Sequence, residues 1–152
     1  MIAAPPIAEI IRNEAALYER LFVLLHEEEE ALVAGRTAAV ADCVTRKENL
    51  VLEIRLAEIA RQSALLRLAR ESAEGSASLD DDPGLAEARE RLRDILPRVQ
   101  LSNRRVAALL DRALARLQAT LEILHESVGP GRRYRADGGL VSALPSTVDG
   151  KV

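Results

Sequence analysis

The fold is decided by residues 85–128, which read LAEARERLRDILPRVQLSNRRVAALLDRALARLQATLEILHESV. Apolar side chains recur along this stretch at alternating steps of four and three residues, with one exception, a second four-residue step from Leu117 to Leu121. This period keeps one stripe on one side of a helix. A helix of this length, roughly 65 Å, needs partner helices from this chain or another to bury the stripe. The stripe positions are Leu92, Leu96, Val99, Asn103, Val106, Leu110, Ala113, Leu117, Leu121, Leu124 and Val128.

Two further helical segments precede this stretch. Residues 7–34 have a wide apolar face and follow two prolines, whose missing N–H groups suit a helix start. Gly35 is typical of a helix end, and Thr37 of the cap of a following helix. Residues 38–72 carry a weaker stripe, in which Lys47 is expected to lay its methylenes along the interface and keep its amine in water. The stripe positions in this second segment are Val40, Val44, Lys47, Val51, Ile54, Leu65 and Leu68.

These segments predict an all-α fold, an elongated antiparallel bundle of three long helices at about 7–34, 38–72 and 85–128, with coiled-coil-like packing. Residues 1–128 are expected to form a single helical domain. Residues 73–84 form a flexible acidic loop within it, and Asp81 or Asp82 before Pro83 signals the start of the third helix. Pro97 is expected to kink this helix rather than end it, because the stripe keeps its phase. Residues 129–152 are expected to be a mobile C-terminal tail.

The composition supports long helices and excludes several classes of function. Hydrophobic residues make up 48% of the 152 residues but aromatic residues only 2%, which is typical of helices and coiled coils. A net charge of −3 gives no basic field for nucleic acid. The start of the chain does not resemble a secretory signal, and no apolar run approaches the ~20 residues of a membrane span. We therefore expect a cytoplasmic protein that is not embedded in a membrane.

No pattern in the sequence indicates an enzyme, and we expect no catalytic residues, no cofactor and no metal site. Glu122 and His125 have the spacing of a di-iron ligand motif, but a second such motif is missing because Val23 stands three residues before His26. The acidic run at residues 27–30 is expected to be a solvated helix face. Cys43 is the only cysteine, which excludes an internal disulfide, and it is expected to be a small interface residue.

Two features of the third segment leave alternatives open. Asn103 in the apolar stripe is either a polar core residue that sets the helix register or a contact to the polar backbone of a partner. The helix also has apolar side chains on both flanks of its stripe, which either complete a three-helix or dimeric core or form a groove for an amphipathic helix from another protein. These flanking residues are Ile95, Leu109 and Ile123 on one side and Leu101, Ala108 and Ala115 on the other.

The order of the sequence motifs resembles the FlgN family of flagellar export chaperones. The first helix ends in LHEEEEAL (residues 25–32), a short AGR break follows (34–36), and RKENL opens the next helix (46–50). After the acidic loop come LSNRRVAALL (101–110) and a tail with YRADG (134–138). The resemblance covers roughly residues 7–139, and Pro97 and the tail beyond Leu140 depart from it.

The resemblance implies a cytoplasmic, non-enzymatic chaperone. Such proteins bind the C-terminal helical segments of hook-associated (hook–filament junction) proteins, keep them unassembled and deliver them to the membrane export gate. Tyr134 matches a tyrosine implicated in docking to that gate. The alternative is a structural coiled-coil protein whose third helix drives homo-oligomerisation, and a homo-oligomer without substrate is compatible with both. The resemblance carries partner binding to Val99, Asn103, Val106, Leu109, Leu110, Ala113, Leu117, Leu121 and Leu124.

Overall fold

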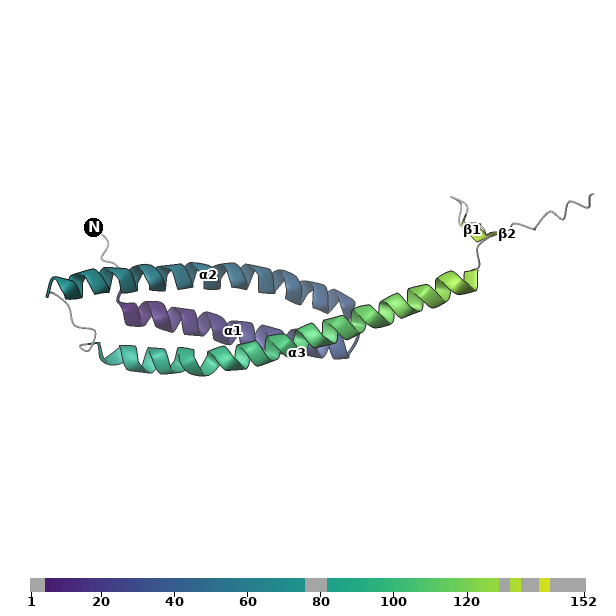
Figure 1. Ribbon diagram of the computed structural model, residues 1–152. Coiled ribbons are helices and arrows are strands. Elements are labelled where there is room, and N and C mark those ends of the chain that lie inside the picture. Colours follow the sequence, from purple (N-terminus) through teal and green to yellow (C-terminus); the bar gives the residue numbers. More distant parts are fainter. Residues whose placement is uncertain (1–4, 76–81, 129–131, 135–139, 143–152) are drawn as a thin grey trace, which may run out of the picture. The chain divides into compact units, whose positions relative to one another are not determined.

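The computed structural model describes residues 5–75, 82–128, 132–134 and 140–142. Three helices dominate the fold, as the sequence predicts: α1 (Ile7–Val33), α2 (Thr37–Ala73) and α3 (Pro83–Val128). Two short strands follow, β1 (Arg132–Tyr134) and β2 (Leu140–Ser142). Figure 1 shows these elements in chain order. The prediction of an all-α bundle of three helices is confirmed.

The chain divides into two compact units, Met1–Leu110 and Asp111–Val152. The predicted domain boundary instead lies after Val128. The difference has a physical reason, because every side chain of α3 from Asp111 to Ser127 is exposed and takes no part in the core formed by the first unit.

The two strands were not predicted. They pair antiparallel, with Arg132 opposite Ser142 and Tyr134 opposite Leu140. The mobility predicted for the acidic loop and the tail concerns mostly residues 76–81, 129–131, 135–139 and 143–152, which lie outside the described residues.

A tight turn joins α1 to α2. Gly35 has a φ of +65°, the left-handed conformation that glycine adopts without a steric penalty. The N–H of Arg36 donates to the carbonyl of Ala31 at 2.9 Å, and that of Gly35 to Leu32 at 3.2 Å. These bonds form a Schellman motif, which confirms Gly35 as the helix stop. The predicted cap at Thr37 is wrong, because Thr37 is already the first residue of α2 and the preceding Arg36 makes no side-chain cap.

The start of α3 follows the predicted signal. Asp82 accepts a hydrogen bond on Oδ1 from the N–H of Gly84 at 3.0 Å, as an N-cap residue does. Pro83 then occupies the first helical position. The helix continues through Pro97 to Val128.

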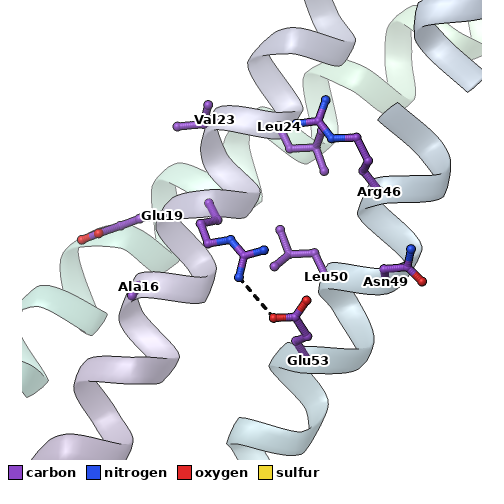
Figure 2. Close-up of a pocket in the computed structure, with 9 residues that line it drawn as sticks. Ala16, Glu19, Val23, Leu24, Arg46, Asn49, Leu50 and Glu53 are labelled. Carbon is purple, nitrogen blue, oxygen red and sulfur yellow. Dashed lines mark hydrogen bonds and ion pairs between the residues drawn. The ribbon is translucent and has the colours of Figure 1, made fainter. Parts of the chain in front are cut away.

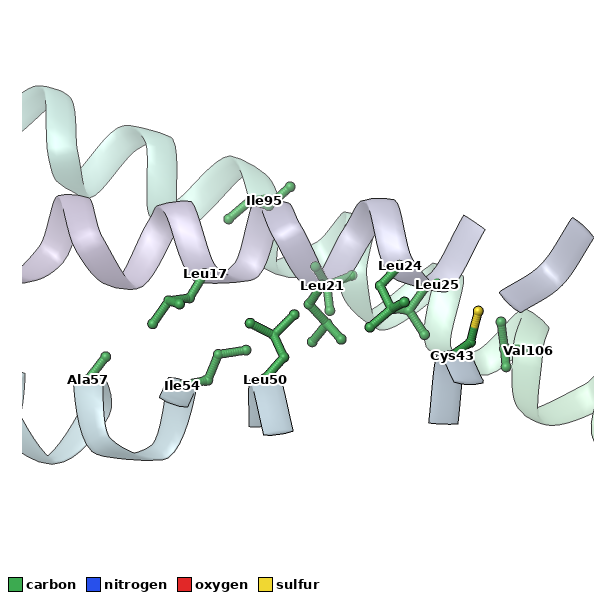
Figure 3. Close-up of a cluster of buried hydrophobic side chains, with 11 residues drawn as sticks. Leu17, Leu21, Leu24, Leu25, Cys43, Leu50, Ile54, Ala57, Ile95 and Val106 are labelled. Carbon is green, nitrogen blue, oxygen red and sulfur yellow. The ribbon is translucent and has the colours of Figure 1, made fainter. Parts of the chain in front are cut away.

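All three helices contribute to the core of the first unit (Figure 3). The buried positions of α2 differ from the predicted ones, since Val40, Val44 and Val51 are only half-buried. Cys43 is buried, in accord with its predicted role at an interface. The main cluster contains Leu17, Leu21, Leu24, Leu25, Cys43, Leu50, Ile54, Ala57, Ile95, Val99 and Val106. A second cluster contains Ile7, Ala8, Ile11, Ala64, Leu85 and Ala88.

Two ion pairs join α1 to α2, and in each of them the glutamate is buried. Lys47 Nζ donates to both carboxylate oxygens of Glu28, at 2.9 and 2.6 Å, and Arg61 Nε donates to Glu14 at 2.7 Å. The side chains of Glu28 and Glu14 are only 0% and 2% exposed. Two predictions are therefore wrong in part. The amine of Lys47 binds a carboxylate rather than lying in water, and the acidic run is not wholly a solvated face.

Candidate partner-binding helix face

The structure divides the predicted binding residues of α3 into two groups. Val99 and Val106 are buried in the main core cluster, and Leu109 and Leu110 are half-buried. Asn103 and the residues beyond Leu110 are exposed, namely Ala113, Leu117, Leu121 and Leu124. The first group therefore packs within the first unit, and the second group is open to a partner.

Four leucines form an exposed apolar stripe on α3, which we call the α3 stripe. Leu114, Leu117, Leu121 and Leu124 are 58%, 57%, 57% and 54% exposed. Their spacing of three, four and three residues keeps them on one side of the helix. These four large aliphatic side chains therefore form a contiguous exposed apolar row, a feature that in other proteins marks interaction sites.

Leu114 is not among the predicted binding residues, because the stripe was predicted to pass through Ala113. The sequence contained one sign that Leu114 belongs to the stripe, namely the second consecutive four-residue step, from Leu117 to Leu121. With Leu114 in place of Ala113, the steps from Leu114 to Val128 alternate three and four without exception. The irregular step then moves to Leu110, the residue at which the first unit ends.

The flanks of the α3 stripe carry little charge. Thr120 donates its hydroxyl to the carbonyl of Arg116 at 2.9 Å, and Ser127 donates to Leu124 at 2.9 Å. These hydroxyls therefore donate hydrogen bonds within their own helix, and a bound partner would not need to accept them. The flanking residues are Asp111, Gln118 and His125 on one side and Ala113, Thr120 and Ser127 on the other.

The charges of this segment are separated along its length. Arg112 and Arg116 lie in its first half, together with Asp111 at its start, and Glu122 and Glu126 lie in its second half. In the described part of the chain none of these four side chains forms an ion pair. They remain available to a partner helix.

Asn103 is exposed, and its amide forms no hydrogen bond with any described residue. The interpretation of Asn103 as a polar core residue is therefore wrong. The buried polar residue of this part of α3 is its neighbour Ser102, which is 3% exposed. The remaining interpretation, a contact to a partner, stays a prediction.

Tyr134, the predicted export-gate contact, is the last residue of β1. Its backbone pairs with Leu140 of β2. Its side chain lies outside what the structure describes.

An open groove of about 640 Å³ lies between α1 and α2. Figure 2 shows Leu24, Leu50 and Glu53 in its lining. Glu53 forms an ion pair with Arg20 at 3.1 Å. The charged residues that line the groove are Glu19, Arg20, Arg46 and Glu53. Among the described residues, no group of three or more His, Cys, Asp or Glu side chains is placed to hold a metal.

Of the helices that the structure describes, none has the length and hydropathy needed to cross a membrane. A comparison with protein-family models matched residues 1–142 to the model described as FlgN protein. Neither the curated proteins nor the solved structures yielded a match. The family model spans the three helices and both strands, and the chain belongs to the FlgN family.

Proposed function

We propose that this chain is a cytoplasmic export chaperone that binds the C-terminal helical segments of hook-associated proteins along the exposed face of α3. The FlgN family consists of flagellar export chaperones, and the binding of this substrate class is the part proposed here. The observation that carries the proposal is the α3 stripe, because four leucines on one side of a helix are more than half exposed. A substrate helix with its own apolar stripe would cover them.

The geometry favours a helix as the bound element. The spacing of Leu114, Leu117, Leu121 and Leu124 matches the seam of a two-helix coiled coil. Because the flanks are nearly uncharged, affinity would come from apolar burial rather than from specific ion pairs. Full burial of one leucine contributes about 1.5–3 kcal/mol, so covering the exposed half of four leucines contributes about 3–6 kcal/mol. A contribution of this size supports a modest, reversible complex. Such a helix, once covered, could not pair prematurely with its assembly partners.

The nine predicted binding residues have different roles in this proposal. Val99 and Val106 hold α3 in the core of the first unit, and the half-buried Leu109 and Leu110 lie beside them in sequence. Asn103 offers a free amide to the backbone or side chains of a substrate. Ala113, Leu117, Leu121 and Leu124 contact the substrate directly, together with Leu114.

Delivery to the export gate is assigned to the tail in this proposal. The resemblance gives Tyr134 the role of a contact with the membrane gate protein. Its position in β1, beyond the end of α3, is separate in sequence from the α3 stripe. One chain could therefore hold a substrate and contact the gate at the same time.

The test is calorimetry of the full chain with C-terminal fragments of hook-associated proteins. The wild type is expected to bind at or below tens of micromolar, and Leu117→Asp to weaken binding at least tenfold with helical content unchanged. Ile123→Asp is the matched control, because Ile123 is 65% exposed but lies on another side of the same helix. Equal affinity for wild type and Leu117→Asp, or equal losses for both variants, would contradict the proposal.

The α3 stripe also favours the alternative function, homo-oligomerisation through the third helix. If two copies of α3 pair antiparallel, Leu114 of each lies opposite Leu124 of the other, and Leu117 lies opposite Leu121. The two functions are separated by light scattering with and without the substrate fragment. Under the chaperone proposal the fragment binds and Leu117→Asp does not change the oligomeric state. Under the alternative Leu117→Asp dissociates an oligomer and no fragment binds.

A further inference from the structure

The charges of residues 111–128 include two pairs of like sign. Arg112 and Arg116 are four residues apart in the first half of this segment, and Glu122 and Glu126 are four residues apart in the second half. Residues at this spacing are neighbours on a helix, where like charges weaken the helix slightly. All four side chains are exposed, and none forms an ion pair in the described part of the chain. The described fold therefore gives these charges no partner.

The segment has a positive half and a negative half. The first half contains two arginines and Asp111, which gives a net charge of +1, and the second half contains two glutamates and a neutral histidine, which gives −2. The helix dipole adds partial negative charge at the C-terminal end of α3. An electrostatic gradient thus runs along the same stretch of helix that carries the α3 stripe.

One charge of each pair lies next to a flank of the α3 stripe. Arg116 is three residues from Ala113 and four from Thr120, and because these side chains are small, the long arginine side chain can extend over them toward a partner. Glu122 lies next to the opposite flank, four residues from Gln118. A helix on the α3 stripe would therefore meet a cation beside the first half of the segment and an anion beside the second half.

We infer that the substrate helix lies antiparallel to α3 on the α3 stripe, with its C-terminal end beside Arg112 and Arg116 and its N-terminal end beside Glu122 and Glu126. The inference rests on the proposed function and adds an orientation to it. Every helix has partial negative charge at its C-terminal end and partial positive charge at its N-terminal end. The antiparallel arrangement brings opposite charges together at both ends, and a parallel arrangement would bring like charges together at both ends.

The leucines and the charges have different roles in this inference. Leucines at alternating steps of three and four residues accept a partner helix in either direction, so the α3 stripe does not select an orientation. Exposed charges contribute little affinity, but complementary charges determine orientation and the choice of partner. The preferred substrate is therefore an amphipathic helix that is more acidic toward its C-terminal end and more basic toward its N-terminal end.

Disulfide cross-linking of the full chain to C-terminal fragments of hook-associated proteins tests the orientation. Ala113→Cys and Ser127→Cys place a thiol on one flank at either end of the α3 stripe. The two positions are roughly 21 Å apart at 1.5 Å per residue, which is beyond the reach of one disulfide. Each fragment carries a single cysteine near its C-terminal or its N-terminal end.

Ala113→Cys is expected to cross-link at least fivefold faster to the fragment with the C-terminal cysteine than to the fragment with the N-terminal cysteine. Ser127→Cys is expected to show the reverse preference. The wild type, whose Cys43 is buried, is the control and should not cross-link. In 1 M salt, where the screening length is about 3 Å, both preferences should fall below twofold.

A charge-exchanged variant tests the cause of the orientation. It combines Arg112→Glu, Arg116→Glu, Glu122→Arg and Glu126→Arg, which changes neither the net charge of the chain nor any leucine of the α3 stripe. With the two cysteine substitutions introduced separately into this background, the cross-linking preferences are expected to reverse by at least twofold. Circular dichroism should show unchanged helical content.

Calorimetry with the same fragments separates failure of this inference from failure of the proposed function. A fragment that binds without the expected cross-linking preference, or a preference that the charge-exchanged variant retains, would overturn the antiparallel orientation and leave the proposed function intact. Absence of binding would overturn both. A cross-link between Ala113→Cys and Ser127→Cys chains that the fragment does not displace would place a second copy on the α3 stripe, and would also overturn the inference.

Discussion

Lys47 reaches a carboxylate that has no contact with solvent. Its Nζ lies 2.9 and 2.6 Å from the two oxygens of Glu28, whose side chain is 0% exposed. A second pair joins Arg61 to Glu14. Glu14 lies fourteen residues before Glu28 on α1, and Arg61 lies fourteen residues after Lys47 on α2. Two heptads thus separate the pairs on each helix, and any slip of the hairpin would leave two buried carboxylates unpaired. The pairs fix the register between α1 and α2.

Breaking the Glu28–Lys47 pair is expected to destabilise the fold strongly. Lys47→Met leaves the Glu28 carboxylate buried without a cation, which costs about 3 kcal/mol or more. The double variant Glu28→Leu with Lys47→Met is expected to recover most of this loss, because no charge is then buried. Urea unfolding measures both. As a control, Arg20→Ala removes an exposed pair and should cost less than about 1 kcal/mol. A single variant as stable as the wild type would contradict the role of the pair.

Gly35→Ala is expected to destabilise the turn between α1 and α2 by about 1–2 kcal/mol. The φ of +65° requires a left-handed backbone, and no atom lies within 4 Å of an added Cβ. The cost therefore comes from the backbone alone. Gly35→Asn should cost less, since asparagine tolerates this conformation better. Thermal unfolding compares the two, and equal stability of wild type and Gly35→Ala would argue against the observed turn.

The stability of the first unit is expected to fall at alkaline pH because of Tyr18. Its hydroxyl donates to Glu58 at 2.6 Å. Burial, and then this bond and the charge of Glu58, raise the pKa of Tyr18 above its ordinary value of 10.0. A pKa that is higher in the folded state gives stability that is complete below pH 10 and is lost as pH rises above it. Unfolding experiments between pH 8 and 11 should show this decline in the wild type and a weaker one in Tyr18→Phe. Identical pH profiles for the wild type and Tyr18→Phe would show that Tyr18 does not cause the loss of stability.

Cys43 is expected to react slowly with thiol reagents. Burial, followed by the nearby charge of Glu27, raises the pKa of its thiol, and the side chain is buried in the main core cluster. Because the thiolate is the reactive form, alkylation of the native protein at pH 7–8 should be at least tenfold slower than alkylation in denaturant. Similar rates in both conditions would mean that Cys43 is accessible.

The sequence predicted the elements that depend on local signals. The three helices end within about two residues of their predicted bounds, because Gly35 and Asp82 act through the backbone next to them. The α2 register was harder to predict. Val40, Val44 and Val51 lie beside the buried side of α2 and are only half-buried. The buried residues Cys43, Leu50 and Ala57 stand one residue before or after an apolar or half-apolar neighbour, so the spacing alone did not separate the two rows.

The remaining differences arose from tertiary contacts. Nothing in the run of four glutamates marks Glu28 as the buried one, since its burial depends on Lys47, nineteen residues away. The exposure of Leu117, Leu121 and Leu124 likewise has no local signal, because buried Val99 and Val106 follow the same spacing in the sequence. The sequence indicated surplus apolar surface on α3 and placed it between Val99 and Leu124. In the structure Leu101 is already 51% exposed, and the continuous exposed row of leucines begins after Leu110.

Hydrogen–deuterium exchange of the full chain with a C-terminal fragment of a hook-associated protein tests the central claim most directly. The account predicts that the amides of residues 111–128 exchange at least tenfold more slowly when the fragment is bound, because a substrate helix covers the α3 stripe. The amides of α1 should exchange as before. Saturated binding without slower exchange in residues 111–128, or with slower exchange only in α1 and α2, would contradict it.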